Sequence, residues 1–465
     1  MTMSAGMAPA RKGKVGIDLT EGPIAKCLIT FASPIVLAAI IQQLYSMVDL
    51  MVIGQFMQGS AGTIGVSTGG EIADLMTPVA TSFGTAGQIY IAQLVGAKNK
   101  ERIHSAMGTL LSLMLVAAAV FALVTFVFAE PLLHLINCPE SGFAQARNYM
   151  RITALGIPFI FGYNAVCGVL RGMGESKAPM LFIIVAAISN IFLDILLVAV
   201  IPLEAAGTAI ATIVAQIASF AAAFLYLYRH KEQFSFELKR SSFSIDRRDL
   251  KVICSIGIPQ VVRSILVHVS MLWVNASVNA FGATASATNS VGNKLQKFLE
   301  IFTTSLSQAS GAMVGQNLGA KKQDRARKTV LTAFAISFSI ACVIALLTYN
   351  FPQPIFRIFT QDEDVLAFCP TYMHIMVFHY LWAAVCSSFQ SMVIGCGNAS
   401  LNFVLGILDG IVCKIGISAL FAYALGFGVT GFFIGTAWSR SIPALINIYY
   451  FFSNKWAKRK LLTEE

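Results

Sequence analysis

Long apolar runs separated by short polar loops make up most of the chain. Twelve runs are long enough to cross a bilayer, since about 20 apolar residues suffice for a membrane-spanning helix. A polar connector from Arg229 to Asp249 separates the sixth run from the seventh. We therefore predict an all-α polytopic membrane protein with twelve transmembrane helices in two groups of six. The predicted spans are residues 24–53, 63–97, 104–129, 145–170, 178–202, 205–228, 252–281, 288–319, 329–351, 366–395, 400–425 and 428–453.

An internal repeat relates the two groups of spans. Gln93-Leu-Val-Gly-Ala-Lys98 returns as Gln316-Asn-Leu-Gly-Ala-Lys321, and Gly172-Met-Gly174 returns as Gly395-Cys-Gly397. Both offsets are 223, from 316 − 93 and 395 − 172. Because each half has six spans, both halves face the same way, and the two six-helix bundles are expected to be related by a pseudo-twofold axis along the membrane normal. The predicted units are an N-terminal lobe at 1–228, a linker at 229–250 and a C-terminal lobe at 251–465.

The first span carries a polar stripe inside an otherwise apolar helix. Tyr45 lies one turn before Asp49, so the phenol and the carboxylate share a helix face, and Gln42 and Ser46 flank that face. A charge at the centre of a membrane helix costs roughly 2.5–3.5 kcal/mol on insertion scales. The stripe must therefore face a cavity or another helix. A hydrogen bond between helices is one interpretation, and an ion or proton site is the other.

Polar residues at helical spacing recur on later spans of the first half. Asn190 and Asp194 are four residues apart on the fifth span, Thr208 and Thr212 are four apart on the sixth, and Asn164 lies on the fourth. Together with Asp49 and Tyr45, they are predicted to line one pocket. Two carboxylates in a poorly hydrated pocket cannot both ionise cheaply, so the pair is expected to hold either a proton or Na⁺. Both ions stay possible at this point.

The second half does not repeat these acids. At the offset of 223, Asp194 maps to Ile417 and Asn190 maps to Cys413. Asp49 maps to Val274 if two more residues are allowed for the spacing of the span prolines. A carboxylate with a purely architectural role would more naturally occur in both halves.

Composition and charge agree with a membrane carrier. Of the 465 residues, 56% are hydrophobic and 12% are charged, against about 25% charged in soluble domains. The net charge of +10 does not indicate nucleic-acid binding, because the basic residues lie in short loops between apolar runs. They collect in the loops around Lys98, Arg171, Arg229 and Lys321 and near both termini, at Arg11, Lys12, Lys14 and Lys455 to Lys460. By the positive-inside rule, both termini are predicted to be cytoplasmic, in the plasma (inner) membrane of the cell.

No catalytic or nucleotide-binding motif was found along the chain, so an enzyme and an ATP-driven pump are not expected. No cofactor is expected apart from H⁺ or Na⁺ as a coupling ion. The expected partners are a small-molecule substrate and membrane lipid, with no nucleic acid, and the protein is expected to be a monomer.

The residues above resemble those of the multidrug and toxic compound extrusion (MATE) family, over residues 20–455. The resemblance is carried by the stripe from Gln43 to Gly54, the paired Gln-x-x-Gly-Ala-Lys loops, Arg171-Gly172-x-Gly174-x-Ser176, Asn190-x-x-x-Asp194 and Gly207-x-Ala209-x-Ala211-Thr212. It implies two six-helix lobes and antiport of drug-like, usually cationic compounds against H⁺ or Na⁺. It also implies that Asp49, Asn190, Asp194 and Thr212 bind the coupling ion, as Na⁺ ligands if Na⁺ is used. Tyr45 and Asn164 would lie beside this site, with Pro34 as the bend point of the first helix.

One departure from the family affects the expected substrate. A branch of the family has acids on the seventh and tenth spans, and none occurs there in this chain, which places it nearer the DinF-like branch. The second half instead carries Arg263, His379 and Lys414 within its spans. These cations either offset acids such as Glu300 and Asp409 or bind an anionic or zwitterionic substrate. The alternative function is therefore a flippase or exporter of a lipid-linked or anionic amphiphilic substrate. Glu71 and Asp74 on the second span are interpreted as structural or as lining the cavity entrance.

Overall fold

The computed structural model describes residues 16–56, 60–234 and 239–464, and all regular secondary structure in these ranges is helical. Arg11, Lys12 and Lys14 lie outside the described residues, as does the side chain of Asp74. The elements are α1 (Ile24–Phe56), α2 (Ser60–Gly96), α3 (Lys100–Val127), α4 (Ala129–Leu135), α5 (Glu140–Gly172), α6 (Lys177–Asp194), η1 (Ile195–Val200), α7 (Glu204–Arg229), α8 (Lys231–Phe234), η2 (Arg240–Phe243), α9 (Arg247–Asn279), α10 (Ala283–Gly319), α11 (Gln323–Asn350), α12 (Pro352–Arg357), α13 (Glu363–Gly395), α14 (Ala399–Ile407), η3 (Leu408–Ile417), η4 (Leu420–Ala424), α15 (Val429–Trp438), α16 (Ser441–Phe452) and η5 (Lys455–Lys458).

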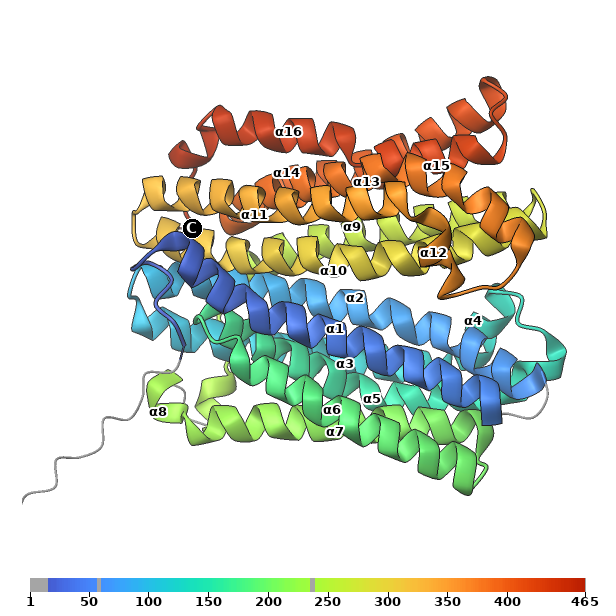
Figure 1. Cartoon of the computed structure of the whole chain (residues 1–465). Helices are drawn as coiled ribbons and strands as arrows, with labels where there is room; N and C mark the ends of the chain where they lie inside the picture. Colours follow the sequence, from blue (N-terminus) through green and yellow to red (C-terminus); the bar gives the residue numbers. More distant parts are fainter. Residues whose placement is uncertain (1–15, 57–59, 235–238, 465) are drawn as a thin grey trace, which may run out of the picture.

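These helical segments, some of them joined end to end, form the twelve predicted spans, which confirms the fold class. Within the described ranges, nine helices are long and apolar enough to cross a membrane. The 37-residue helices α2 and α10 and the α15–α16 pair complete the set. Figure 1 shows α1 to α7 forming one bundle and α9 to α16 forming the other, side by side. The linker predicted at 229–250 holds α8 and η2, and α9 already begins at Arg247.

The last predicted span is interrupted rather than continuous. α15 ends at Trp438 and α16 begins at Ser441. Pro443 has no N–H to donate to the carbonyl of Ser439, so the helical hydrogen-bond ladder cannot run through this point. The break places Arg440 between the two helices, inside the second bundle.

The helix bounds repeat with the same offset as the sequence motifs. α2 and α10 begin at 60 and 283 and end at 96 and 319, so both offsets are 223. α1 and α9 begin at 24 and 247, which is again 223. The extra two residues allowed from the prolines are therefore not supported by the helix bounds, and Asp49 corresponds to Leu272 rather than Val274. Either partner is apolar, so the first half alone carries the acid.

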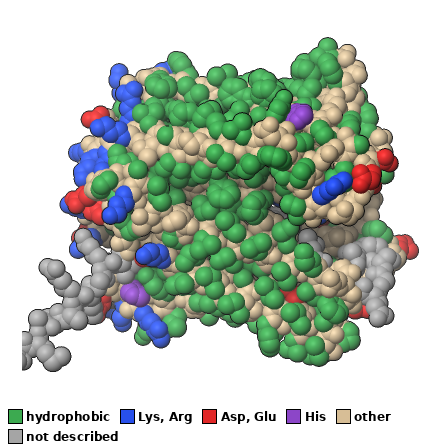
Figure 2. Space-filling view, in the orientation of Figure 1, with side chains coloured by type: hydrophobic (Ala, Val, Ile, Leu, Met, Phe, Trp, Pro, Cys, Tyr) green, Lys and Arg blue, Asp and Glu red, His purple; other side chains and the backbone are tan. Residues whose placement is uncertain are grey.

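Charge is segregated to the ends of the molecule. Figure 2 shows a broad hydrophobic belt with Lys and Arg side chains gathered at one end. We call this end, which carries Lys98 and Lys321, the basic end. The opposite end, with Glu140 and Asp362, is called the acidic end. The two bundles diverge towards the acidic end, near α4 and α12 (Figure 1).

At the basic end, the repeated Gln-x-x-Gly-Ala-Lys motifs join the two bundles reciprocally. Gln93 Nε2 donates to the Gly395 carbonyl at 2.7 Å, and Gln316 Nε2 donates to the Gly172 carbonyl at 2.9 Å. The two hydrogen bonds are the same bond repeated by the pseudo-twofold axis, since both donor and acceptor differ by 223.

The glycines of these motifs allow the backbones to meet. A Cβ on Gly96 would lie 2.0 Å from the Gln316 carbonyl oxygen, and a Cβ on Gly319 would lie 2.0 Å from the Gln93 carbonyl oxygen. Such distances are impossible for a real side chain, so glycine is required at both positions for this contact.

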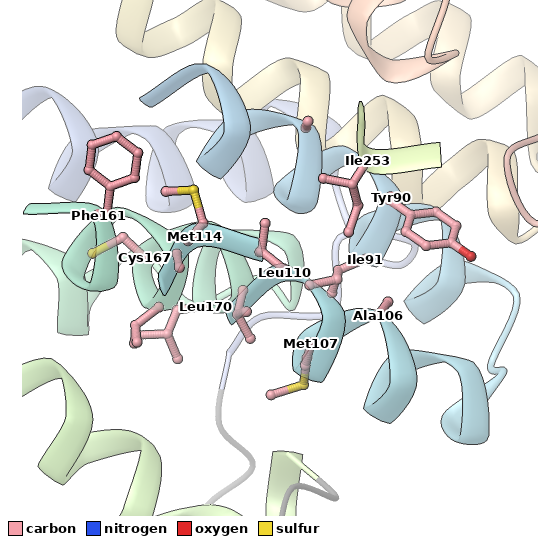
Figure 3. Close-up of a cluster of buried hydrophobic side chains, with 14 of the residues drawn as sticks. Tyr90, Ile91, Ala106, Met107, Leu110, Met114, Phe161, Cys167, Leu170 and Ile253 are labelled. Carbon is pink, nitrogen blue, oxygen red and sulfur yellow. The ribbon is translucent and has the colours of Figure 1, made fainter. Parts of the chain in front are cut away.

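Apolar packing reinforces the contact between the bundles. Ile253 of α9 joins a buried cluster with Tyr90, Ile91 and Leu110 of the first bundle (Figure 3). Leu462 also belongs to this cluster, is 2% exposed, and donates its backbone N–H to Gln93 Oε1 at 2.9 Å. The basic end is therefore closed by a continuous core shared between the two bundles.

Replacement of Gly319 by alanine is expected to open the basic end, because the added Cβ overlaps the Gln93 carbonyl. A cysteine at position 462, in a variant lacking the nine native cysteines, would report this opening through its rate of maleimide labelling. We expect labelling to rise several-fold with Gly319→Ala. Gly311→Ala in the same helix is the control, since its Cβ would meet its nearest neighbour at an ordinary 3.4 Å. Equal labelling rates in the two variants would contradict the proposed role of the glycine contact.

Candidate functional site

A cavity of about 750 Å³ lies within the first bundle and reaches the second bundle at α10. Its walls come from α1, α2, α3, α5, α6, α7 and α10, and they combine apolar residues with hydroxyls, amides and a few charges. This size is within the range of pockets for drug-sized ligands. The polar and charged lining residues are Gln42, Tyr45, Ser46, Asp49, Thr77, Thr81, Thr125, Tyr149, Thr153, Tyr163, Asn164, Arg171, Ser176, Thr212, Gln216, Thr304, Ser305 and Gln308.

Asp49 connects this cavity to a buried polar pair. Its carboxyl group faces the cavity and also contacts the side chains of Asp194 and Asn190. Asp194 is 1% exposed and Asn190 is 2% exposed, so both lie behind the cavity wall. The structure therefore brings together α1 and α6, and with them the two acids that the sequence placed in one pocket.

The hydrogen bonding of this pair is incomplete. Among the described residues, Asp49 Oδ1 and both carboxylate oxygens of Asp194 are buried without a hydrogen-bond partner. Two facing carboxylates offer only acceptors, and unpaired buried charges cost several kcal/mol. A proton shared between the oxygens would supply the missing hydrogen-bond donor, and a cation bound by them would supply the missing positive charge.

The helix that holds Asp194 changes form directly after it. α6 ends at Asp194 and the π-helical segment η1 begins at Ile195. Short π-helical insertions are frequent at functional sites because they re-aim side chains and leave backbone groups less tightly bonded. No sequence pattern predicted this change.

The other predicted site residues are placed as follows. Gln42, Tyr45, Asn164 and Thr212 line the cavity, and the Asn164 amide donates to the Ile160 carbonyl at 2.8 Å. Thr208 does not line it, which corrects our expectation. α7 packs tightly against η1 at this level, where a Cβ on Gly207 would lie 2.7 Å from the Leu197 carbonyl oxygen.

Pro34 is buried in α1 and lies far from the acids. The helix continues through it without a break from Ile24 to Phe56. Asp49 follows 15 residues later, about 22 Å along the axis. The bend role of Pro34 stays a prediction.

Several lining residues were missed by sequence reasoning. Thr304, Ser305 and Gln308 bring the second bundle into the cavity wall, and Gln216 extends the α7 face that holds Thr212. Arg171 adds a cation, and its Nε is buried without a hydrogen-bond partner among the described residues. Arg171 is the first residue of the Arg-Gly-x-Gly motif, so this motif was the sequence signal that could have identified it as a cavity residue.

In the second bundle, the residue equivalent to Thr212 lies at a close helix contact. Gly435 occupies the position of Thr212 at the offset of 223, and a Cβ there would lie 2.0 Å from Ser418 Oγ. A threonine at position 435 could therefore not be accommodated without moving the helices apart.

A buried charge network occupies the core of the second bundle. Glu300 Oε1 lies 2.9 Å from both Arg440 Nη2 and His379 Nε2. The other ring nitrogen of His379 lies 3.1 Å from the Thr436 carbonyl oxygen. Arg440 was not anticipated as the main partner of Glu300, because it reaches Glu300 only through the break between α15 and α16.

Two further cations belong to the same network. Arg263 donates to Asn402 at 3.0 Å and to Gln390 at 3.2 Å, which are both neutral amides. Lys414 is 6% exposed and lies near Asp409, which is 2% exposed. Arg263, Lys414 and Arg440 thus face two carboxylates, Glu300 and Asp409, before His379 is counted. We predicted that cations of the second half offset Glu300 and Asp409. The contacts of Glu300 agree with this prediction, but the network contains one more basic side chain than acidic ones.

A helical membrane protein built from two repeated bundles around a drug-sized cavity has the architecture of a transporter rather than of an enzyme. The chain belongs to the MatE family, whose family model matches residues 34–196 and 259–420. The two matched ranges correspond to the two halves of the repeat. The assignment to a branch of this family stays a prediction.

Relatives and solved structures agree with this family. The chain is 26% identical over 436 residues to the probable multidrug resistance protein YoeA of Bacillus subtilis strain 168, covering 93% of this chain and 94% of the relative. It is 22% identical over 427 residues to the multidrug export protein MepA of Staphylococcus aureus strain MSSA476, covering 91% and 93%.

Two solved structures share the fold at low sequence identity. An outward-facing MATE family multidrug resistance transporter of the MOP superfamily superposes with a TM-score of 0.89 at 19% identity, covering 97% of this chain and 100% of that chain. A MOP superfamily transporter from Pyrococcus furiosus, described as having a binding pocket of reverse polarity, gives 0.88 at 19% identity, covering 95% and 98%.

The unpaired oxygens predict an unusual effect of Asp194→Asn on stability. At alkaline pH without sodium, the new amide can donate to Asp49, so we expect stabilisation by about 1 kcal/mol. The gain should shrink at acidic pH, where a shared proton already joins the two carboxylates. Thermal unfolding followed with a thiol-reactive dye would measure this, since five native cysteines are buried.

Asp249→Asn is the matched control, because it makes the same chemical change at a carboxylate with partners. Asp249 is 0% exposed and is held by Arg102 at 2.5 Å and by the Tyr90 hydroxyl at 2.6 Å. This variant should be destabilised by about 1–3 kcal/mol at both pH values. Destabilisation of the same size by Asp194→Asn would contradict the unpaired state of the acidic pair.

Proposed function

We propose that this protein is a secondary active antiporter that exports a drug-like organic substrate carrying a positive charge. The coupling ion is H⁺ or Na⁺, bound by Asp49 and Asp194 with Asn190 beside them and Thr212 in the adjoining cavity wall. The observation that supports this proposal is the contact between two carboxylates, three of whose oxygens lack donors among the described residues, next to a cavity of about 750 Å³.

Each residue has a distinct part in this exchange. Asp49 faces both the cavity and Asp194, so its charge is available either to the substrate or to the ion. When a proton or Na⁺ occupies the pair, the negative charge at the cavity wall falls and a cationic substrate is released. When the ion leaves, Asp49 again attracts a substrate cation. The membrane potential contributes about 2.3 kcal/mol per charge and 100 mV.

We propose that the basic end faces the cytoplasm of a cell with an inner membrane, in accordance with the positive-inside rule. The closed basic end then seals the cytoplasmic side, and the diverging acidic ends correspond to an outward-facing state. Rocking of the two lobes about their shared core would break the reciprocal glutamine bonds and open the cavity inwards. The names of the relatives YoeA and MepA support export of drugs as the direction of transport.

Asp49→Asn is expected to abolish coupled transport while the protein is still made and inserted. The test is uptake of ethidium, an organic cation, into everted membrane vesicles, with a pH gradient and a Na⁺ gradient imposed separately. We expect uptake to fall to that of vesicles without the protein, and Asp194→Asn to give a matching loss.

Glu130→Gln serves as the control, since Glu130 is 45% exposed and lies away from the cavity. Wild-type uptake by Asp49→Asn would refute the assigned site. If Asp194→Asn transported normally, a single-carboxylate mechanism would replace the pair. The gradient that drives wild-type uptake identifies the coupling ion.

A second candidate function is export of an anionic or lipid-linked amphiphile. The excess positive charge in the second bundle favours it, and the Pyrococcus furiosus transporter of this fold is described as having a pocket of reverse polarity. The acidic pair in the first bundle favours the antiporter. Loss of ethidium uptake in Asp49→Asn, with no wild-type transport of a purely anionic dye, would decide for the antiporter.

The proposed orientation predicts which positions are accessible from outside the cell. Cysteines placed at Glu140 and Asp362, both exposed, should react with a membrane-impermeant maleimide in intact cells. Cysteines placed at the exposed residues Lys98 and Lys321 should react only after permeabilisation. The reverse pattern would overturn the topology.

A further inference from the structure

One face of α10 carries two lysines for which the described residues provide no counterion. Lys294 and Lys297 of α10 are exposed. Thr304 and Gln308, which line the cavity, follow Lys297 by 7 and 11 residues and so lie on the same helix face. Lys297 is about 10 Å along α10 from Thr304, on the side of the acidic end. The lysines therefore continue, beyond its lining residues, the α10 face that contributes to the cavity wall.

Neither lysine is neutralised by the protein in the described ranges, where no ion pair or hydrogen bond involves either ammonium group. The one acid on α10, Glu300, is already bound by Arg440 and His379. Because Glu300 already has these two partners, it is not available as a counterion for a lysine one turn away.

The interior behind this wall adds to the positive potential. Arg263, Lys414 and Arg440 exceed Glu300 and Asp409 by one charge. Arg440 is 17% exposed and Glu300 is 21% exposed, so this pair is not sealed from the surroundings of α10. The core of the second bundle therefore contains more basic than acidic side chains in this network.

The first bundle presents the opposite charge. Asp49 faces the cavity from α1, with Asp194 behind it, and Glu71 is exposed on α2. Arg171 is the cation of that wall, but it lies at the last turn of α5, near the basic end. Across the cleft, an acidic wall on α1 therefore faces a cationic wall on α10.

We propose that Lys294 and Lys297 form an anion-binding site for a carboxylate or similar group of the transported substrate. The substrate class is then a zwitterionic amphiphile, with its basic group towards Asp49 and its anionic group towards α10. This inference rests on the proposed antiport function and adds a second recognition site to it. The lysines act as specificity-determining residues, and they take no part in ion coupling.

Two dyes that differ in a single group test this assignment. Rhodamine B has a free carboxylate and is a zwitterion, whereas its ethyl ester is a monocation of nearly the same shape. Uptake of each dye is measured in everted vesicles containing the wild-type protein or Lys294→Gln/Lys297→Gln. Exposed charge pairs are weak individually, so we expect the double variant to lose about fivefold to tenfold in kcat/KM for rhodamine B. Uptake of the ester should change by less than about twofold.

Two control variants keep the outcome interpretable. Lys294→Arg/Lys297→Arg retains both charges and should restore rhodamine B uptake. Lys328→Gln removes an exposed lysine at the basic end and should affect neither dye. Equal loss of both dyes, or no loss of either, would overturn the anion site. Failure of the wild-type protein to transport either dye under any imposed gradient would instead refute the antiport function itself.

Discussion

The contact between Asp49 and Asp194 is the constraint on which the rest of the molecule depends. A low-dielectric bundle cannot hold two facing carboxylates unless something positive lies between or beside them. Elsewhere in this protein, buried carboxylates have fixed cationic partners, as Asp249 has Arg102 and Glu300 has Arg440. The first bundle provides no such partner for its pair. In the part of the chain that the structure describes, a proton or cation from solution is the compensating charge available to the pair, as the proposed antiport requires.

The two bundles use the same fold for different purposes. The first holds a cavity next to its acids, while the second has a close glycine contact at Gly435 and a network of charged side chains around Glu300. A network of this kind contributes little net stability, but it fixes the geometry of the helices that share it. We interpret the second bundle as the more rigid of the two. In the proposed mechanism, the first bundle changes shape relative to it when the coupling ion binds.

The spans, the repeat and the family followed from the sequence because hydropathy and motif spacing are local properties. The proximity of Asp49, Asn190 and Asp194 could also be predicted from the sequence, since polar residues in membrane helices pack against one another rather than against lipid. The contribution of Thr304 and Gln308 to the cavity wall could not be predicted from the sequence. Their helix is polar along much of its length, so its sequence does not mark one face as cavity-lining. Arg440 was missed for a different reason. Its contact with Glu300 depends on a helix break that a continuous apolar run conceals.

The reciprocal bonds of Gln93 and Gln316 have a consequence for how the basic end opens. Each glutamine is held by the other half of the molecule, and the two bonds lie on either side of one symmetry axis. A rotation that keeps the pseudo-twofold relation between the bundles stretches both bonds together. Release is therefore a single cooperative event, and an intermediate with one bond intact would have to break the symmetry of the repeat.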